Sequence, residues 1–585
     1  MKRVLLCTAL LLSAEWAVAQ DLANKFDLGT LSGNFQADGQ YYLQDTLIDP
    51  LGEAYPDERF LGTGFLNLTY RRGNFSAGIR YENYQNNRVG LPAGYKGEGI
   101  TYRYARFTKD RFDVTVGNFY EQFGSGLVLR AYEERGLGID NNLDGLKMAF
   151  TATDGVVIRG VIGRQRNYFE KSEGIVRGAD IEWSLRNTFK WESNTNFLIG
   201  GSYVSKFQAA DDPIYDLPQN VAAAAVRANL ITGTFNFFGE FAYKANDPAL
   251  DNGFIYKDGT ALYLTGSYAK NNLGISVGVK RYDNFSFRSQ RVSDPQQLLI
   301  NYLPSLTTLH TYALPALYSF NTIAVGEQGL QAEVSYNFKS KTPLGGKYGT
   351  QVTASYAISQ SLDKEYVDEN GNRLDRPIYN PADTSLTGAY TQAGSEGYQS
   401  NFFGLGNIKY FQDIHISVKK KLNKKWKGTF TYYNFVFDND YMRKGANDYN
   451  FYIAGVKPHS YTINVAVVEL LYKIKPRHSL RMEFQGLFTG TTDGIKQDRG
   501  DWALVLFEYS ISPHWFIAIQ DAYNFGNPDS DLQIHYVNAN IGYTVGTTKF
   551  QLGYGRQQAG VFCVGGICRT VPASNGFAIG ITSNF

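Results

Sequence analysis

The sequence is poor in sulfur, in proline and in net charge. It contains 3 Cys, 4 Met and 17 Pro in 585 residues, and 57 Lys and Arg against 55 Asp and Glu leave a formal net charge of +2. A chain this close to neutral has no basic field for nucleic acid, so we expect no nucleic-acid partner. No Pro-rich, Ser-rich or charged linker divides it, which favours one large domain.

Long apolar runs are missing after the first twenty residues. The best candidates, Val221 to Thr232 and Ile463 to Leu471, are short and carry Arg227 and Glu469. A helix that crosses a membrane needs about 18 or more consecutive apolar residues. The sequence therefore excludes helical membrane spans.

The first nineteen residues have the pattern of a secretory signal peptide. Lys2 and Arg3 precede an apolar run from Val4 to Leu12, and Ala17-Val18-Ala19 supplies a small-x-small cleavage site. We expect residues 1–19 to be removed, leaving residues 20–585 as the mature chain. The mature chain would keep Cys563 and Cys568, whose close spacing in an exported protein predicts a small disulfide loop. Two cysteines without a nearby His supply too few ligands for a metal site.

Glycine and aromatic residues are abundant, and they occur in alternating segments of about ten residues. The chain has 60 Gly, 42 Tyr and 39 Phe. In the clearest segment, the apolar positions alternate with polar ones and are Val537, Ala539, Ile541, Tyr543 and Val545. A period of two indicates β-strands with chemically opposite faces.

The alternation favours a membrane barrel over a soluble sandwich for three reasons. The polar positions are rich in Gly, Asn and charge, aromatic residues recur near segment ends, and the connections alternate between short and long. Twelve long loops plus eleven short turns join about 24 strands, with 22 to 26 as the range. We therefore predict an all-β fold, a single transmembrane antiparallel up-and-down β-barrel in a bacterial outer membrane, in contact with outer-membrane lipid and lipopolysaccharide.

The end of the chain repeats the pattern. Phe577, Ile579, Ile581 and Phe585 share one parity, and Ser583 departs from it. This resembles the closing strand of bacterial outer-membrane barrels, whose terminal aromatic residue is read by the barrel-assembly machinery. The resemblance implies that machinery as a partner.

A second resemblance rests on the segment QFGSGLVLRAYEERGLGIDNNLDG (Gln122 to Gly145), which covers 24 of the 585 residues. Together with the leader ending AVAQ, the Tyr and Gly content and the Asn-rich loops, it is similar to a group of large, poorly characterised outer-membrane barrel proteins from Bacteroidota. The resemblance implies location and fold, and no mechanism.

Three long loops stand out, at 120–144, 286–326 and 361–403. The first is a candidate constriction because its mixed charges suit pairing with lumen side chains, although a solvated loop explains them equally well; the charges are Arg130, Glu133, Glu134, Arg135, Asp140 and Asp144. The second contains an apolar stretch, Tyr302 to Val325, which needs cover from the lumen, a partner or the membrane. The third has the Tyr, Ser, Gly and Asn content of adaptable recognition loops.

Strand parity also predicts which charges face the lumen. The six basic and six acidic candidates are Arg80, Arg103, Lys244, Lys280, Lys419, Arg481, Glu82, Asp180, Glu182, Glu240, Glu333 and Glu483. Equal numbers predict no strong ion preference of the wall, and neighbours such as Arg80 and Glu82 suit local salt bridges. The basic run Val418 to Lys427 is expected to place lysines near lipid headgroups.

Two functional hypotheses follow. The first is a porin-like or gated channel narrowed by loops 120–144 and 286–326. The second is a partner-bound barrel in protein secretion or surface display, which binds through loops 286–326 and 361–403. A TonB-dependent receptor is disfavoured because only eleven residues, 20–30, precede the first strand. The six His are scattered and no GxSxG, HExxH or Walker-type motif occurs, so we expect neither an enzyme nor a cofactor. The channel is preferred because it needs no unseen partner.

Overall fold

A computed structural model describes residues 28–585 apart from 53–55, 87, 211, 214, 294–296, 321, 368–371, 375–393, 439–459 and 565–566. The predicted signal peptide, residues 1–19, lies outside the described residues. So does most of the predicted recognition loop 361–403. Among the described residues, no helix combines the length and the apolar character that a membrane span requires.

Twenty-four strands form one closed antiparallel sheet, since the sheet has 25 strands and one of them, the two-residue β20 (Arg373–Leu374), pairs with β19 alone. The first twelve are β1 (Thr30–Tyr42), β2 (Phe60–Arg72), β3 (Phe75–Gln85), β4 (Gly97–Lys109), β5 (Phe112–Phe119), β10 (Leu143–Thr153), β11 (Val156–Asn167), β12 (Glu170–Ser184), β13 (Asn196–Phe207), β14 (Asn220–Ile231), β15 (Phe235–Lys244) and β16 (Gly259–Lys270). The others are β17 (Leu273–Asp283), β18 (Gly326–Phe338), β19 (Thr350–Val367), β21 (Tyr398–Lys421), β22 (Trp426–Asp438), β23 (Ser460–Lys475), β24 (His478–Thr489), β27 (Trp502–Ile511), β28 (Trp515–Tyr523), β29 (His535–Val545), β30 (Thr548–Gln557) and β33 (Ser574–Asn584).

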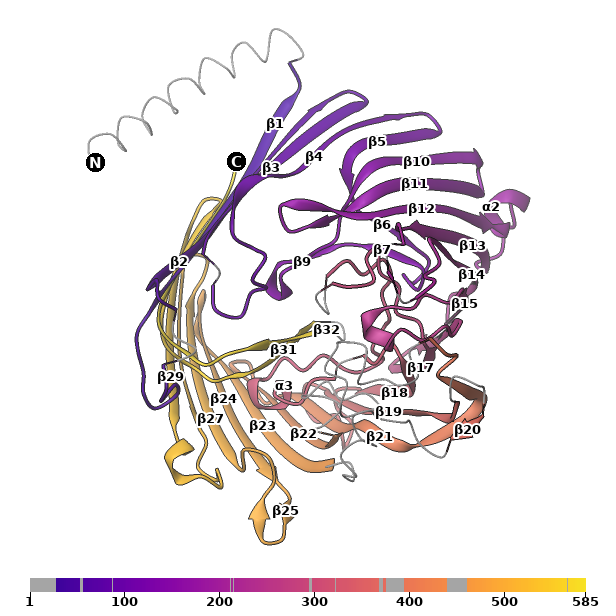
Figure 1. Ribbon diagram of the computed structural model, residues 1–585. Coiled ribbons are helices and arrows are strands. Elements are labelled where there is room, and N and C mark those ends of the chain that lie inside the picture. Colours follow the sequence, from indigo (N-terminus) through magenta and orange to yellow (C-terminus); the bar gives the residue numbers. More distant parts are fainter. Residues whose placement is uncertain are drawn as a thin grey trace.

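Each strand pairs with its neighbour in the chain, and β33 pairs with β1 to close the ring (Figure 1). The seam is in register from Asn34 opposite Asn584 to Tyr42 opposite Gly576. The predicted antiparallel barrel of about 24 strands is confirmed.

The outward face is apolar, as the alternation predicts. On β10, Leu146 and Met148 are exposed, whereas Lys147 between them belongs to the opposite face. At the C-terminus, Phe577, Ile579 and Phe585 are exposed on the same outward face. Recognition of these residues by the assembly machinery stays a prediction.

Two of the long connections fold into the barrel (Figure 1). The first runs from β5 to β10 and contains β6 (Glu121–Phe123), β7 (Leu129–Ala131), β8 (Glu133–Glu134), η1 (Arg135–Leu137) and β9 (Ile139–Asp140). The second runs from β17 to β18 and contains α3 (Ala313–Ala316). We call them the first loop (120–142) and the second loop (284–325).

A further hairpin, β31 (Gly560–Val564) with β32 (Ile567–Val571), also reaches across the interior (Figure 1). Its backbone places Cys563 directly opposite Cys568. The side chains of this hairpin are not among those described, so the disulfide stays a prediction.

The remaining short elements lie in connections between strands of the wall. They are α2 (Leu185–Phe189), η2 (Leu250–Asn252), β25 (Thr491–Thr492), β26 (Ile495–Lys496) and η3 (Ser530–Leu532). Of these, η2 packs against the second loop, where the Leu250 N–H donates to the Arg291 carbonyl at 3.1 Å.

Close backbone approach fixes the wall where the first loop rejoins it. Gly145 of β10 lies opposite Gly117 of β5 and Gly163 of β11. A Cβ at Gly145 would lie 2.6 Å from the Cα of Gly163 and closer still to the carbonyl oxygen of Ile162. Backbone atoms cannot swing aside as a flexible side chain can, so this position requires glycine.

We therefore expect Gly145→Ala to destabilise the folded barrel by about 1–3 kcal/mol through overpacking. Gly64→Ala in β2 is the control, because a Cβ there meets no atom within 4 Å. The measurement is the urea midpoint for loss of the heat-modifiable form on gels. Equal midpoints for the two variants would contradict the close-approach argument.

Candidate functional site

Buried charges join the first loop to the barrel wall. Asp140 of the loop accepts hydrogen bonds from Arg80 of β3 and, at 2.6 Å, from Arg166 of β11. Arg166 also donates to Glu82 at 2.6 Å. Glu133 of the loop lies 3.0 Å from the guanidinium of Arg80. Arg80, Glu82, Asp140 and Arg166 are each at most 5% exposed, so this network is shielded from solvent.

The charge of Asp140 is stabilised by its partners. Burial alone would raise its pKa, but the charges of Arg80 and Arg166 and hydrogen bonds from Asn142 and Tyr120 hold the pKa of Asp140 below its ordinary value. Removing one member of such a buried network leaves an uncompensated charge, which costs about 3–5 kcal/mol. The loop is therefore tied to the wall electrostatically.

A second polar contact lies at the FGSG turn of the first loop. Glu240 of β15 accepts hydrogen bonds from the Ser125 backbone N–H at 2.7 Å and from Ser125 Oγ at 2.5 Å. Gly124 has a φ of +55°, and a Cβ there would collide with the Glu240 carboxylate. The glycine thus permits both the turn and the close approach.

Apolar side chains of the first loop complete the contact. Phe123, Leu127, Val128 and Leu129 are 0–1% exposed and share a hydrophobic cluster with small residues of the wall, among them Ala223. Each large apolar side chain buried in this way contributes about 1.5–3 kcal/mol. This part of the lumen is packed like a protein core.

The two loops hold each other as well as the wall. The Arg130 N–H donates to the Ile300 carbonyl at 2.8 Å, and the Tyr302 N–H donates to the Gly126 carbonyl at 2.9 Å. The Arg130 guanidinium lies 3.9 Å from the centre of the Tyr302 ring. The loops therefore form one body, which we call the plug.

The far half of the second loop packs on the opposite wall. Tyr318 shares a cluster with Phe435 and Phe437 of β22. The His310 Nε2 atom lies 3.2 Å from Asp413 of β21, and the other oxygen of Asp413 lies 3.1 Å from His415 Nδ1. The plug thus bridges β11–β17 on one side and β21–β28 on the other.

Eleven of the twelve charged residues predicted to face the lumen do stand at inward positions. The strand registers show this, because these residues share a face with buried residues of the wall. Several are paired there: Lys280 lies 2.5 Å from Glu327, and Arg481 contacts Glu469 and Glu483. Asp180 accepts hydrogen bonds from Arg159 and Arg227, each at 2.8 Å.

The prediction for Arg103 is wrong. Its side chain lies on the outward face, opposite the exposed Ile79. The cause is a β-bulge: Arg80 pairs with Tyr102 and Tyr81 with Ile100, so Thr101 is an extra residue that reverses the parity after it.

The position of Asp144 also differs from the prediction. It belongs to β10, not to the loop, and it follows Leu143, whose side chain is fully buried. Alternation therefore turns Asp144 to the other face, where it lies 3.5 Å from Arg103 and 2.6 Å from Lys171. Of the other loop charges, Arg135 contacts Glu133 at 2.5 Å and Glu134 caps η1.

Sequence parity missed three important wall charges, Arg166, Glu327 and Asp413. A register shift between Arg164 and Arg166 brings Arg166 inward against its parity. Glu327 and Asp413 do follow the alternation. The charged partners Lys280 and His415 could have indicated their inward position from the sequence.

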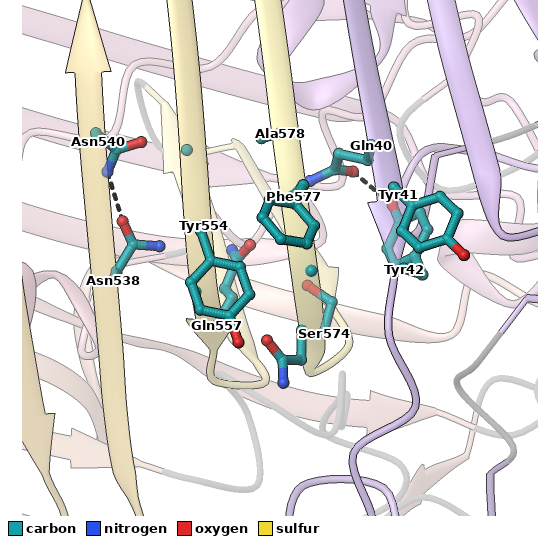
Figure 2. Close-up of a pocket in the computed structure, with 14 residues that line it drawn as sticks. Gln40, Tyr41, Tyr42, Asn538, Asn540, Tyr554, Gln557, Ser574, Phe577 and Ala578 are labelled. Atoms are coloured by element: carbon teal, nitrogen blue, oxygen red, sulfur yellow. Dashed lines mark hydrogen bonds between the residues drawn. The ribbon is translucent and has the colours of Figure 1, made fainter.

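The wall at the seam differs from the rest. Described residues of β30, β33 and β1 belong to neither of the two large hydrophobic clusters that hold the plug. The inward positions here carry mainly amides and small residues: Gln36, Gln40, Asn538, Asn540, Gln551, Gly553, Ala578 and Gly580. Two charged residues share this face, since Asp38 lies opposite Gly580 and Lys549 lies opposite Thr582. A cavity of about 140 Å³ lies at this seam. Figure 2 shows the residues that line it, with Asn540 donating to Asn538 and Tyr42 donating to Gln40.

Among the described residues, no group of three or more His, Cys, Asp or Glu side chains is arranged to hold a metal ion.

The lowered pKa of Asp140 predicts a pH dependence of the first loop. Its ionised form stabilises the docked loop above its ordinary pKa of 3.8, and this contribution is lost as the pH falls below that value through the folded pKa. Hydrogen exchange at the Arg130 and Tyr302 amides, corrected for intrinsic rates, should accelerate over this range. Asp140→Asn should exchange fast at pH 7 already.

Asp113→Asn is the control, because Asp113 pairs with Arg106 in a solvent-exposed salt bridge away from the plug. It should leave the exchange of the loop unchanged. Equal protection of the loop in Asp140→Asn and the unmodified protein at pH 7 would contradict the electrostatic attachment.

Comparison with known proteins places the chain in a family. No curated protein matches the sequence. Among solved structures, it is similar to the siderophore receptor PirA from Pseudomonas aeruginosa, with 10% identity, coverage of 95% of this chain and 81% of that chain, and a TM-score of 0.39. It is also similar to the P pilus usher (PapC) translocation pore, with 9% identity, coverage of 95% and 99%, and a TM-score of 0.40. Scores this low carry no argument about function. The profile of a family of unknown function, DUF6029, matches residues 1–585, and the chain therefore belongs to that family.

Proposed function

We propose that the protein is an outer-membrane channel that is closed by its own plug and opens when the plug moves. The observation that carries the proposal is the division of the lumen wall. One arc is charged and apolar and binds the plug, whereas the seam arc is lined mainly by amides and glycine, with Asp38 and Lys549 as its charged residues.

The membrane location is supported by the outward face. Large apolar side chains such as Ile79, Val116 and Phe237 are exposed there on many strands, and an apolar belt around a closed barrel suits lipid. In bacterial barrels of this kind the short turns lie on the periplasmic side and the long loops outside the cell.

The seam arc would supply the route for solute. Its small side chains leave space, and its amides hydrogen-bond without selecting a charge. Solute would pass beside a displaced first loop, whose polar contacts with the wall would be exchanged for water and whose apolar contacts with the wall would separate.

A second candidate function is partner binding at the long-loop end. The strand β21 continues beyond its neighbour β22, and its outer part exposes Phe402, Phe403 and Leu405, of which Phe403 is 89% exposed. Exposed aromatic residues of this kind suit a protein partner. The plug argues for the channel, however, because the second loop is buried in the lumen and is not displayed.

The proposal is tested by single-channel conductance of the refolded protein in planar bilayers. Replacing residues 121–141 with a short Gly-Ser linker should raise the conductance about fivefold or more, since a wide barrel then loses part of its filling. The control replaces 491–496, a surface hairpin formed by β25 and β26 that projects away from the barrel (Figure 1). It should leave the conductance unchanged.

A folded barrel without residues 121–141 that conducts no better than the unmodified protein would overturn the channel. Heat-modifiability gels of both variants establish that the barrel is closed. Co-purification of a stoichiometric partner that is lost on Phe403→Ser would then favour the second candidate.

A further inference from the structure

Twelve basic residues gather at the short-turn end of six neighbouring strands. Segments 339–349, 419–427 and 473–477 contain three, six and three Lys or Arg residues respectively, and no Asp or Glu. They form the turns of the β18–β19, β21–β22 and β23–β24 hairpins, and these strands are consecutive in the wall. We call this region the lysine rim.

Part of the rim faces the lumen and not lipid. Lys419 and Lys421 follow Asp413 and His415 at intervals of two along β21, so they share the inward face of those buried residues. Lys427 of β22 lies directly opposite Lys421. The outward face at this level is marked by Trp426, stacked on Tyr472 with ring centres 4.5 Å apart.

The inward lysines therefore have another role than the one expected from the sequence. A lysine that reaches a lipid headgroup has to lie on the outward face or in a turn. Lys419, Lys421 and Lys427 lie in neither place, because alternation directs their side chains to the inner mouth of the barrel. Headgroup contact remains suitable for the turn residues Lys424 and Lys425.

These charges have no carboxylate partner among the described residues. The salt bridges within 4.0 Å include the lumen cations Lys206, Lys280 and Arg481, but none of the twelve basic residues of the rim. Like charges directly opposite each other on adjacent strands are destabilising. The pair Lys421 and Lys427 thus lowers stability unless an anion from outside the chain lies between them.

A groove at the same place can hold such an anion. It has a volume of about 380 Å³ and is lined by Lys339, Lys419, Lys421 and Lys427 together with Tyr348 and Asn337. The ammonium groups of Lys347 and Lys421 lie 5.6 Å and 5.2 Å from the centre of the Tyr348 ring. Tyr348 and Asn337 add an aromatic surface and an amide to the positive charge.

We propose that the groove of the lysine rim, lined by Lys419, Lys421 and Lys427, is a docking site for an acidic segment of a soluble protein. A polypeptide is favoured over a single small anion because the groove takes side chains from two hairpins, and because the amide of Asn337 can pair with a peptide backbone. Binding rests on the groove alone. The proposed membrane orientation would make this partner periplasmic.

The test uses the full-length barrel in neutral detergent and fluorescein-labelled hexaglutamate, followed by fluorescence anisotropy. The variant Lys419→Gln/Lys421→Gln/Lys427→Gln should bind about tenfold more weakly, as expected for the loss of three ion pairs of about 0.5 kcal/mol each. The control Lys341→Gln/Lys424→Gln/Lys425→Gln removes the same charge from the turns and should bind within about twofold of the unmodified protein.

Competition identifies the class of ligand. Hexaglutamate should displace the probe at a lower concentration than triphosphate or vesicles of anionic lipid. Equal losses in the two triple variants, or displacement by triphosphate or by vesicles at lower concentrations than by hexaglutamate, would overturn the proposal. Gels confirm that all variants are closed barrels, and because binding requires no conductance, failure of this test is distinguishable from failure of the channel.

Discussion

Closure of the sheet on itself is the constraint on which everything else depends. A sheet with an apolar outward face cannot leave an edge unpaired, because unpaired backbone N–H and C=O groups are costly where water is excluded. The pairing of β33 with β1 removes the edges, and the Gly33 and Phe585 backbones bond reciprocally at 2.7 and 3.0 Å. Closure with 24 strands creates a wide interior, and a wide interior has to be filled or left to water.

The chain fills part of this interior with its own loops, which pack on two arcs of the wall. The apolar contacts bury surface between the plug and the wall, and the buried charges fix the position of the plug. Two wall strands supply Arg80 and Arg166, and the first loop supplies Asp140. When the loop is docked, Asp140 is therefore paired with both cations. The FGSG turn against Glu240 adds a second fixed point.

The inward face of this one sheet thus has three regions that differ in their side chains. The plug arc is charged and apolar, the seam arc is lined mainly by amides and small residues, and the short-turn mouth of β18–β24 is basic. Alternation makes this possible, since each strand changes its inward residues without altering the outward belt. A barrel can therefore vary its lumen while its outward surface stays constant.

The sequence by itself determined the strands, their number and the inward position of most charges. Alternation of period two is a local signal, and each short turn between two such segments joins neighbours in the sheet. Tertiary structure decided what local patterns do not contain. The bulge at Thr101 reversed Arg103, and the register shift before Arg166 brought that guanidinium to Asp140. From the sequence alone, the charges of the first loop were equally compatible with solvent and with the lumen. The pairing of Asp140 with Arg80, 60 residues away, depends on closure of the wall around the loop.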